Sequence, residues 1–167
     1  MMSLYQLFKA SLYSPKKIAA FRLIPIGKVM QYIFLYILFL TILSFIDFTY
    51  GISAQQQNME GLLAYFSEIE WLLYPFAFLF LFVLNTLFMF IRISIFGYIG
   101  QIILSFRKRR GEYRHIWRTA LFASTVPMII SLILSIFHWS NTLTQLFIYS
   151  LTFIYLFLAT KHYPIQR

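Results

Sequence analysis

Two polar residues, Asn85 and Arg92, lie inside a long apolar stretch and are the first candidates for chemistry. Placing an Arg side chain near the middle of a bilayer costs from about 2.5 to well over 10 kcal/mol. Such an Arg is therefore expected to pair with a carboxylate, a backbone carbonyl or a lipid headgroup. Asn85 precedes Arg92 by seven residues, which places both on one helical face. We therefore treat Asn85 and Arg92 as a candidate intramembrane polar site.

Simpler interpretations of these polar residues stay open. Arg92 follows Trp71 by 21 residues, about one bilayer thickness, so its side chain could snorkel to the inner interface. Asn85 could serve only to join two helices, since an interhelical hydrogen bond from Asn contributes about 0.6–2 kcal/mol. Asp47 falls at the end of an apolar run of bilayer length, so we expect it at the outer headgroups.

A basic segment at 107–118 is the second candidate. It carries Arg107, Lys108, Arg109, Arg110, Arg114 and Arg118. Such a run could bind nucleic acid, but here it is a short tether between apolar stretches, next to an anionic leaflet that attracts each Lys or Arg by about 1 kcal/mol. We expect these six side chains to contact lipid headgroups or a protein partner, and we expect no nucleic acid.

Residues suited to catalysis are scarce. The sequence has no Cys, three His and five acidic residues, and it contains no HExxH, glycine-rich phosphate loop or GxSxG motif. Glu68 and Glu70 are two residues apart, so on a helix they point in different directions. We predict no catalytic, metal or cofactor site, and we expect the protein not to be an enzyme.

The composition indicates which elements position these residues. Hydrophobic residues make up 60% of the chain and charged residues only 11%, whereas soluble domains average about 45–50% and 25%. A spanning helix needs about 20 apolar residues, and four stretches qualify: 29–48, 71–91, 119–137 and 142–160. Lipid offers no partner for free backbone groups, so each must be helical. The sequence predicts a single all-α membrane domain with four transmembrane helices.

The charges predict how these helices are oriented. Thirteen of the fourteen basic residues fall in 1–28, in 107–118 or after 160, and Arg92 is the exception. The external loop 49–70 would carry acids but no Lys or Arg. Positively charged loops stay in the cytoplasm, so both termini and the 107–118 loop are expected inside.

Two short amphipathic stretches are expected to lie along the membrane surfaces. Residues 1–28 form a cytoplasmic interfacial segment in which Leu4, Leu7, Phe8 and Leu12 share a face. A second stretch follows Asn58 in the external loop. Residues 92–106 could continue the second span or lie on the inner surface, and we favour a helix that leaves the membrane obliquely.

Small residues follow one face of the third predicted span. These are Ala120, Ser124, Pro127, Ser131 and Ser135. Such a face lets helices approach closely in lipid. Pro127 removes a backbone hydrogen bond and is expected to kink the span.

The N-terminal residues resemble a known family. Pro15-Lys16-Lys17-Ile18-Ala19, then Phe21-Arg22, Gly27-Lys28 and Tyr32, lead into the first span. This pattern is similar to the bacterial membrane proteins called domain of unknown function 1189, which are found chiefly in Firmicutes and grouped with Yip-type multi-span proteins. The resemblance implies a bacterial plasma-membrane protein, in a family where some members carry the label "maltodextrin utilization". The short external loop departs from the larger external segment expected of the family.

These observations favour a non-catalytic accessory or scaffold that contacts anionic inner-leaflet lipid and partner membrane proteins or a second copy of itself. The alternative is a small transporter or permease subunit, linked to maltodextrin uptake, in which Asn85 and Arg92 line a path. A membrane enzyme acting on lipid has the least support.

Overall fold

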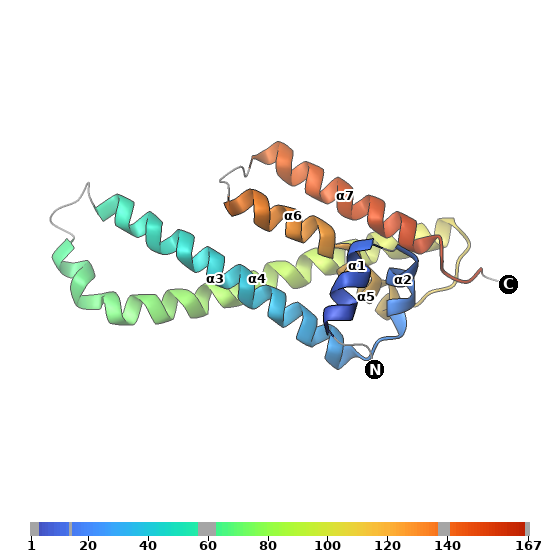
Figure 1. The fold of residues 1–167 in the computed structure, drawn as a ribbon, viewed down its shortest axis with the longest axis horizontal. Coiled ribbons are helices and arrows are strands. Elements are labelled where there is room, and N and C mark those ends of the chain that lie inside the picture. The colour runs from blue at the N-terminus through green and yellow to red at the C-terminus, as the bar shows by residue number, and fades with distance from the viewer. Residues whose placement is uncertain (1–3, 14, 57–62, 137–140, 166–167) are drawn as a thin grey trace. The chain divides into compact units, whose positions relative to one another are not determined.

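The structure is a computed structural model that describes residues 4–13, 15–56, 63–136 and 141–165. This part of the chain forms helices and no strand (Figure 1). The elements are α1 (Leu4–Tyr13), α2 (Pro15–Ala20), the 3₁₀ turn η1 (Phe21–Leu23), α3 (Ile26–Gln56), α4 (Leu63–Phe106), α5 (Tyr113–Ala123), α6 (Thr125–Ile136) and α7 (Thr142–Thr160). The all-α prediction is confirmed.

Among the described residues, four helical segments are long and apolar enough to cross a membrane, as the sequence predicts. They are Ile26–Gly51, Trp71–Phe106, Tyr113–Leu134 and Thr142–Thr160. The first is longer than predicted at both ends, the second begins at the predicted residue and ends later, and the third begins earlier than predicted and is described to Leu134. The fourth, 142–160, has the predicted bounds.

α4 is one continuous helix of 44 residues. It includes 92–106, so this segment continues the second span rather than forming a separate surface element. It also includes the described residues of the second amphipathic stretch, while 57–62 lie outside the described residues. Figure 1 shows α4 curving in its first, green part, which contains Pro75. A proline inside a helix removes one backbone hydrogen bond and commonly bends it.

The chain divides into two compact units, and unit 2 is the simpler. It comprises Gln31–Phe90, which includes most of α3 and the first part of α4. Phe45 on α3 meets Tyr74 and Phe78 on α4 edge to face, with ring centroids 6.1 and 5.6 Å apart. Aromatic pairs in this geometry contribute about 0.5–1.5 kcal/mol beyond the area they bury. These rings hold the two antiparallel helices together.

Unit 1 comprises Met1–Met30 and Ile91–Arg167. α2 packs on α5 and α7, α6 packs on α7, and α1 packs on α2 and α6. Leu7, predicted to face the membrane surface, is fully buried among these helices. α5 crosses α4 where Gly100 leaves room, since a Cβ at Gly100 would lie 2.6 Å from Cγ1 of Ile116. The glycine therefore sets how closely α5 approaches α4.

The third span consists of two helices. α5 ends at Ala123 and α6 begins at Thr125, with Ser124 between them. Pro127 has no N–H to donate to the carbonyl one turn earlier, at Ala123, so the helix breaks in the turn before the proline. This agrees with the expected kink. The segment 107–118, expected to be a loop, is helical from Tyr113 because Ile116 and Thr119 form a buried face of α5.

Candidate functional site

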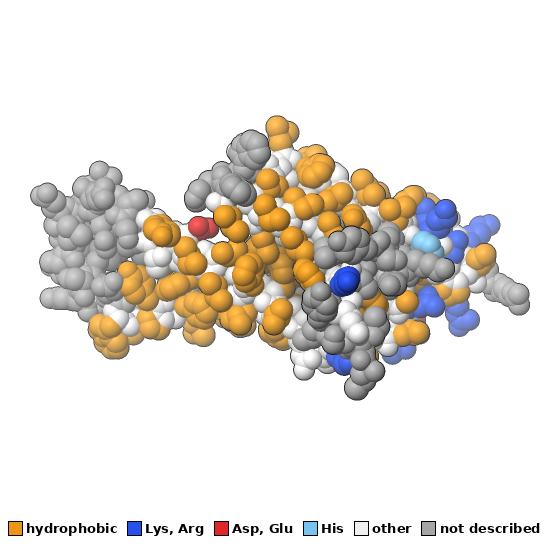
Figure 2. All heavy atoms as spheres, in the orientation of Figure 1, with side chains coloured by type: hydrophobic (Ala, Val, Ile, Leu, Met, Phe, Trp, Pro, Cys, Tyr) orange, Lys and Arg blue, Asp and Glu red, His pale blue; other side chains and the backbone are white. Residues whose placement is uncertain are grey.

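The two units differ sharply in charge. All fourteen Lys and Arg residues fall within the residues of unit 1, together with one acid, Glu112, whereas those of unit 2 include four acids and no Lys or Arg. Figure 2 shows blue side chains gathered at the end of unit 1 where Figure 1 places the C-terminus. The turn after α4, the start of α5 and the C-terminal tail meet at this basic end.

The turn after α4 has a defined backbone geometry. The N–H of Arg109 donates to the carbonyl of Leu104 at 2.9 Å, and that of Lys108 to the carbonyl of Ser105 at 3.1 Å. This pair of bonds is a Schellman motif, which requires a left-handed residue at its C′ position. Lys108 occupies that position with φ 52°, although glycine is the usual residue there.

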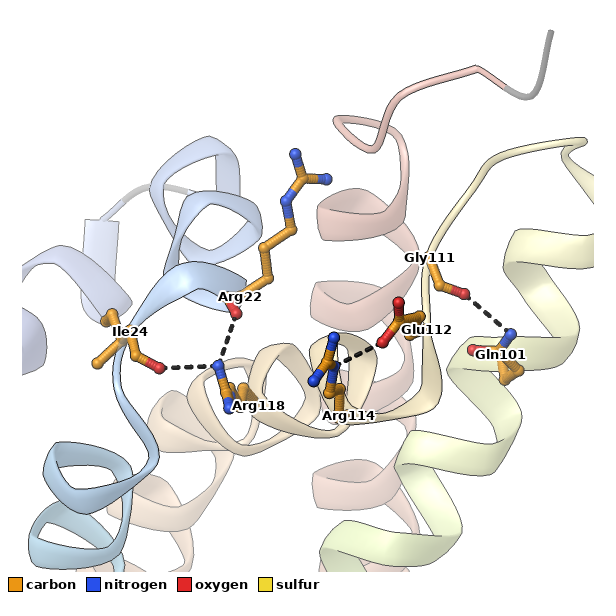
Figure 3. A network of polar contacts seen from close by, with 7 residues as sticks. All are labelled: Arg22, Ile24, Gln101, Gly111, Glu112, Arg114 and Arg118. Carbon is orange, nitrogen blue, oxygen red and sulfur yellow. Dashed lines mark hydrogen bonds and ion pairs between the residues drawn. The ribbon is translucent and has the colours of Figure 1, made fainter.

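The turn is also attached to the C-terminal tail and to α4. The N–H of Arg110 donates to the carbonyl of Pro164 at 2.9 Å, and Arg109 forms an isolated antiparallel bridge with Ile165. Nε2 of Gln101 on α4 donates to the carbonyl of Gly111 at 3.1 Å (Figure 3). These bonds fix the backbone that carries the basic side chains.

Three of the six predicted cations are bonded to carbonyls of the chain itself. Arg107 donates to the carbonyl of Phe157 at 3.3 Å and stacks on that ring, with Cζ 3.8 Å from its centroid. Arg109 donates from Nη1 to the carbonyl of Tyr163. Arg118 donates to the carbonyls of residues 22 and 24, at 3.0 and 2.9 Å. These three arginines tie together segments far apart in the sequence.

The other three cations, Lys108, Arg110 and Arg114, have exposed side chains. Arg114 forms an ion pair with Glu112 at 2.5 Å, and both side chains are more than 60% exposed. Such surface pairs contribute about 0–1 kcal/mol, so this one leaves Arg114 able to exchange partners. The structure thus divides the predicted contact residues into a structural set and an accessible set.

Tyr163 is the buried centre of this end, and the sequence analysis missed it. Its hydroxyl lies 2.6 Å from the hydroxyl of Thr119, and the guanidinium of Arg22 stacks over its ring at 4.9 Å. Burial raises the pKa of the Tyr163 phenol above its usual value, and both Thr119 and Arg22 oppose that rise. No sequence pattern marks this cluster, because its members come from η1, α5 and the tail.

Arg92 lies beside the middle part of α7. Its Cζ is 5.1 Å from the ring centroid of Tyr149, which comes seven residues after Thr142 and eleven before Thr160. At about 1.5 Å per residue, Tyr149 lies roughly 10 Å from one end of α7 and 16 Å from the other. The structure thus places Arg92 beside α7, a helix long and apolar enough to cross a membrane.

Asn85 belongs to unit 2 and bonds across to α3. Its Nδ2 lies 3.3 Å from Oγ1 of Thr41 and 3.5 Å from Oγ of Ser44. Thr41 is fully buried and donates to the carbonyl of Ile37 at 2.9 Å. This arrangement suits the interpretation of Asn85 as a residue that joins two helices. The contacts given above for Asn85 are with residues of unit 2, and the contact given for Arg92 is with a residue of unit 1.

Within the described residues, no group of three or more His, Cys, Asp or Glu side chains is arranged to hold a metal ion.

The comparisons with known proteins give one family. A family model described as "Protein of unknown function (DUF1189)" matches residues 47–160, more than half of the chain. The match begins after the N-terminal residues that carry the resemblance noted above, and it does not bear on the Yip-type grouping. No curated protein and no solved structure matches the chain significantly.

Proposed function

The chain belongs to the DUF1189 family of membrane proteins, and from that premise we propose that it is a non-catalytic accessory or scaffold protein of the bacterial plasma membrane. Both termini and the basic end of unit 1 lie in the cytoplasm in this proposal. Lys108, Arg110 and Arg114 contact anionic lipid of the inner leaflet. The apolar helix faces contact partner membrane proteins or a second copy of the chain.

The observation that carries the lipid contact is the charge of unit 1. Its residues include fourteen cations and a single acid, and the accessible cations sit on a backbone fixed to the tail and to α4. Each Lys or Arg near an anionic leaflet contributes about 1 kcal/mol, so three together contribute about 3 kcal/mol. That is enough to hold the basic end against a surface of anionic headgroups.

Two features support the scaffold role: the exposed apolar surface of the helices and the scarcity of residue types suited to catalysis. Long apolar side chains are exposed along α7, including Leu143, Leu146 and Phe147. The sequence has no Cys, and its few acids and His leave little from which to build a catalytic site. Surface of this kind suits contact with lipid or with another helix.

The test of lipid contact compares phosphatidylglycerol with phosphatidylcholine, each added to the full chain in detergent. Replacing Lys108, Arg110 and Arg114 together by Gln should weaken phosphatidylglycerol binding on the order of 100-fold and leave phosphatidylcholine binding unchanged. Added salt should weaken wild-type binding to phosphatidylglycerol. Equal affinity of the wild type for the two lipids would contradict the lipid contact.

The scaffold role needs a separate measurement. Purification in mild detergent should yield an assembly, either with a membrane protein that cross-links to the chain in intact cells or with a second copy of the chain. An isolated monomer that turns over a substrate would contradict this role.

A second candidate function rests on Arg92. A cation beside the ring of Tyr149, with Phe96 6.4 Å from the same ring, combines polar and aromatic surface at the middle of α7. This suits a small transporter or permease subunit, and the label that some members of the family carry suggests maltodextrin as the substrate. Arg92→Leu should then abolish uptake of labelled maltodextrin while the variant still inserts and folds. Unchanged uptake would exclude this function.

A further inference from the structure

Two arginines from distant parts of the chain converge on Tyr163. Arg22 on η1 places its guanidinium 4.9 Å from the centre of the Tyr163 ring. Arg109, from the turn after α4, donates to the backbone carbonyl of the same tyrosine. Both cations thus contact one buried residue, Arg22 at the ring and Arg109 at the backbone carbonyl, although 87 positions separate them in the sequence.

Within the described residues, most hydrogen-bond donors of these two side chains have no hydrogen-bond acceptor. Each guanidinium has five N–H donors. Within the described part of the chain, the structure gives Arg22 a stacking contact and no side-chain hydrogen bond, and it gives Arg109 one bond, from Nη1. The position is therefore rich in donors.

Hydrogen bonds from Arg118 fix the backbone at Arg22. Nη1 of Arg118 donates to the carbonyls of Arg22 and Ile24 at 3.0 and 2.9 Å, and Figure 3 shows the Arg22 side chain pointing away from Arg118. Phe21 packs edge to face on Phe122 with ring centroids 4.9 Å apart. Arg22 therefore extends from a fixed point toward the tail, and Arg118 acts as a positioning residue.

The charges around this position favour an anion. Both arginines bring a positive charge to Tyr163, and the acid among the residues of unit 1, Glu112, forms an ion pair with Arg114. Planar guanidinium groups match the oxygens of a phosphate group in paired hydrogen bonds. An anionic oxygen group that accepted hydrogen bonds from both arginines would offset their charge and use their remaining donors.

We propose that Arg22 and Arg109, supported on Tyr163, form a binding site for a phosphate group. The group belongs either to the headgroup of an anionic lipid or to a soluble phosphorylated compound. The lipid source rests on the proposed function, whereas the soluble source does not.

The test measures dissociation constants of the full chain in detergent for phosphatidylglycerol, for diacylglycerol, which lacks the phosphate, and for inorganic phosphate. Arg22→Gln keeps the carbonyl that Arg118 binds and should weaken binding of the phosphate-bearing probe at least about tenfold. Lys161→Gln removes the same charge from an exposed position nearby and should change binding less than about twofold at physiological salt. Arg22→Lys keeps the charge but loses the planar fork, so it should fall between the two.

The three probes separate the two sources. Binding of phosphatidylglycerol alone assigns the site to a lipid headgroup, and binding of inorganic phosphate as well assigns it to a soluble phosphate compound. If Arg22→Gln is unfolded in the absence of ligand, the comparison of Arg22→Lys with Lys161→Gln tests the site instead. Arg22→Lys should then show the larger loss of binding. Equal losses for the Arg22 and Lys161 variants, or binding of diacylglycerol as tight as that of phosphatidylglycerol, would overturn the site. The variant lacking Lys108, Arg110 and Arg114 tests the proposed function separately, because it leaves Arg22 and Arg109 in place.

Discussion

At the scale of single residues, Tyr163 makes the stability of the basic end depend on alkaline pH. Burial raises the pKa of its phenol in the folded chain above the ordinary value of 10.0. Below that value the phenol is neutral in both the folded and the unfolded state, so it adds no pH dependence. As the pH rises above about 10, the unfolded state loses the proton first, so the free energy of unfolding falls.

We therefore predict that Tyr163→Phe makes the chain less sensitive to alkaline pH. At neutral pH the variant should be less stable by about 1 kcal/mol, because it loses the hydrogen bond with Thr119. Above about pH 10 the difference in unfolding free energy between the variant and the wild type should become smaller, because only the wild type loses stability through Tyr163. Thermal unfolding in detergent at a series of pH values measures both effects. A variant whose stability falls as steeply as that of the wild type would contradict the assignment to Tyr163.

Lys108 gives a second prediction at this scale. It holds a left-handed conformation that costs a non-glycine residue roughly 1–2 kcal/mol. Lys108→Gly should therefore raise the unfolding free energy by about 1 kcal/mol, as measured by thermal unfolding.

Lys161→Gly is the matched control for Lys108→Gly. Lys161 caps α7 in a right-handed conformation, with φ −58° and ψ −24°. Glycine there should stabilise nothing, since it only adds backbone freedom to the unfolded chain. The same sign for both substitutions would show that charge, rather than conformation, decides the outcome.

The sequence identifies the polar residues but not their partners. It singles out the cations of 107–118, yet Arg107 bonds to a carbonyl 50 positions away and Arg118 to one 96 positions away. Contacts at such separations depend on how the helices pack, which no local pattern encodes. For the same reason Arg22 and Tyr163 attract no notice in the sequence, although they lie at the centre of the basic end.

At the scale of elements, the approach of α5 to α4 depends on Gly100. A Cβ there would lie 2.6 Å from Cγ1 of Ile116 and 3.3 Å from Cδ2 of Leu156. Gly100→Ala should destabilise unit 1 by about 1–3 kcal/mol, because Ile116 must move within a packed core. Unfolding in detergent measures the loss.

Gly27→Ala serves as the control for this substitution. A Cβ at Gly27 meets nothing within 4 Å, so the variant should be neutral or slightly more stable. Losses of similar size at both positions would mean that close packing is not what Gly100 provides.

Elements were easier to predict than their packing. Apolar length alone gives four spans, and Pro127 indicates the break that the structure places at Ser124. The boundary of α5 was harder, because its polar first turn resembles a loop until Ile116 and Thr119 are seen to be buried. Leu7 was expected to meet the membrane surface for a similar reason, since an amphipathic face looks the same whether lipid or protein covers it.

At the scale of the whole molecule, the orientation of the chain is a prediction that its composition makes easy to test. The sequence has no Cys, so a single introduced Cys is the only thiol. Asn141→Cys places the thiol in the predicted external loop before α7. Lys161→Cys places it at the other end of α7, which is predicted to be cytoplasmic. An impermeant maleimide should label the first in intact cells and the second only after permeabilisation.

The opposite pattern of labelling would place the basic end outside the cell. Contact with the inner leaflet would then be excluded, whereas a phosphate site at Arg22 and Arg109 would remain testable in detergent.

The length of α4 has a consequence for the membrane around the protein. Its apolar part, Trp71–Phe106, has 36 residues, so a straight helix would be about 54 Å long against a hydrocarbon core of about 30 Å. Even a tilt of about 40°, the upper end of the usual range, shortens the crossing only to about 41 Å. A bilayer accommodates a helix of such apolar length by thickening locally, unless protein covers the excess, and Ile93, Phe96 and Leu104 are already buried within unit 1. Lipid chain length should therefore influence where this protein resides and with what it associates.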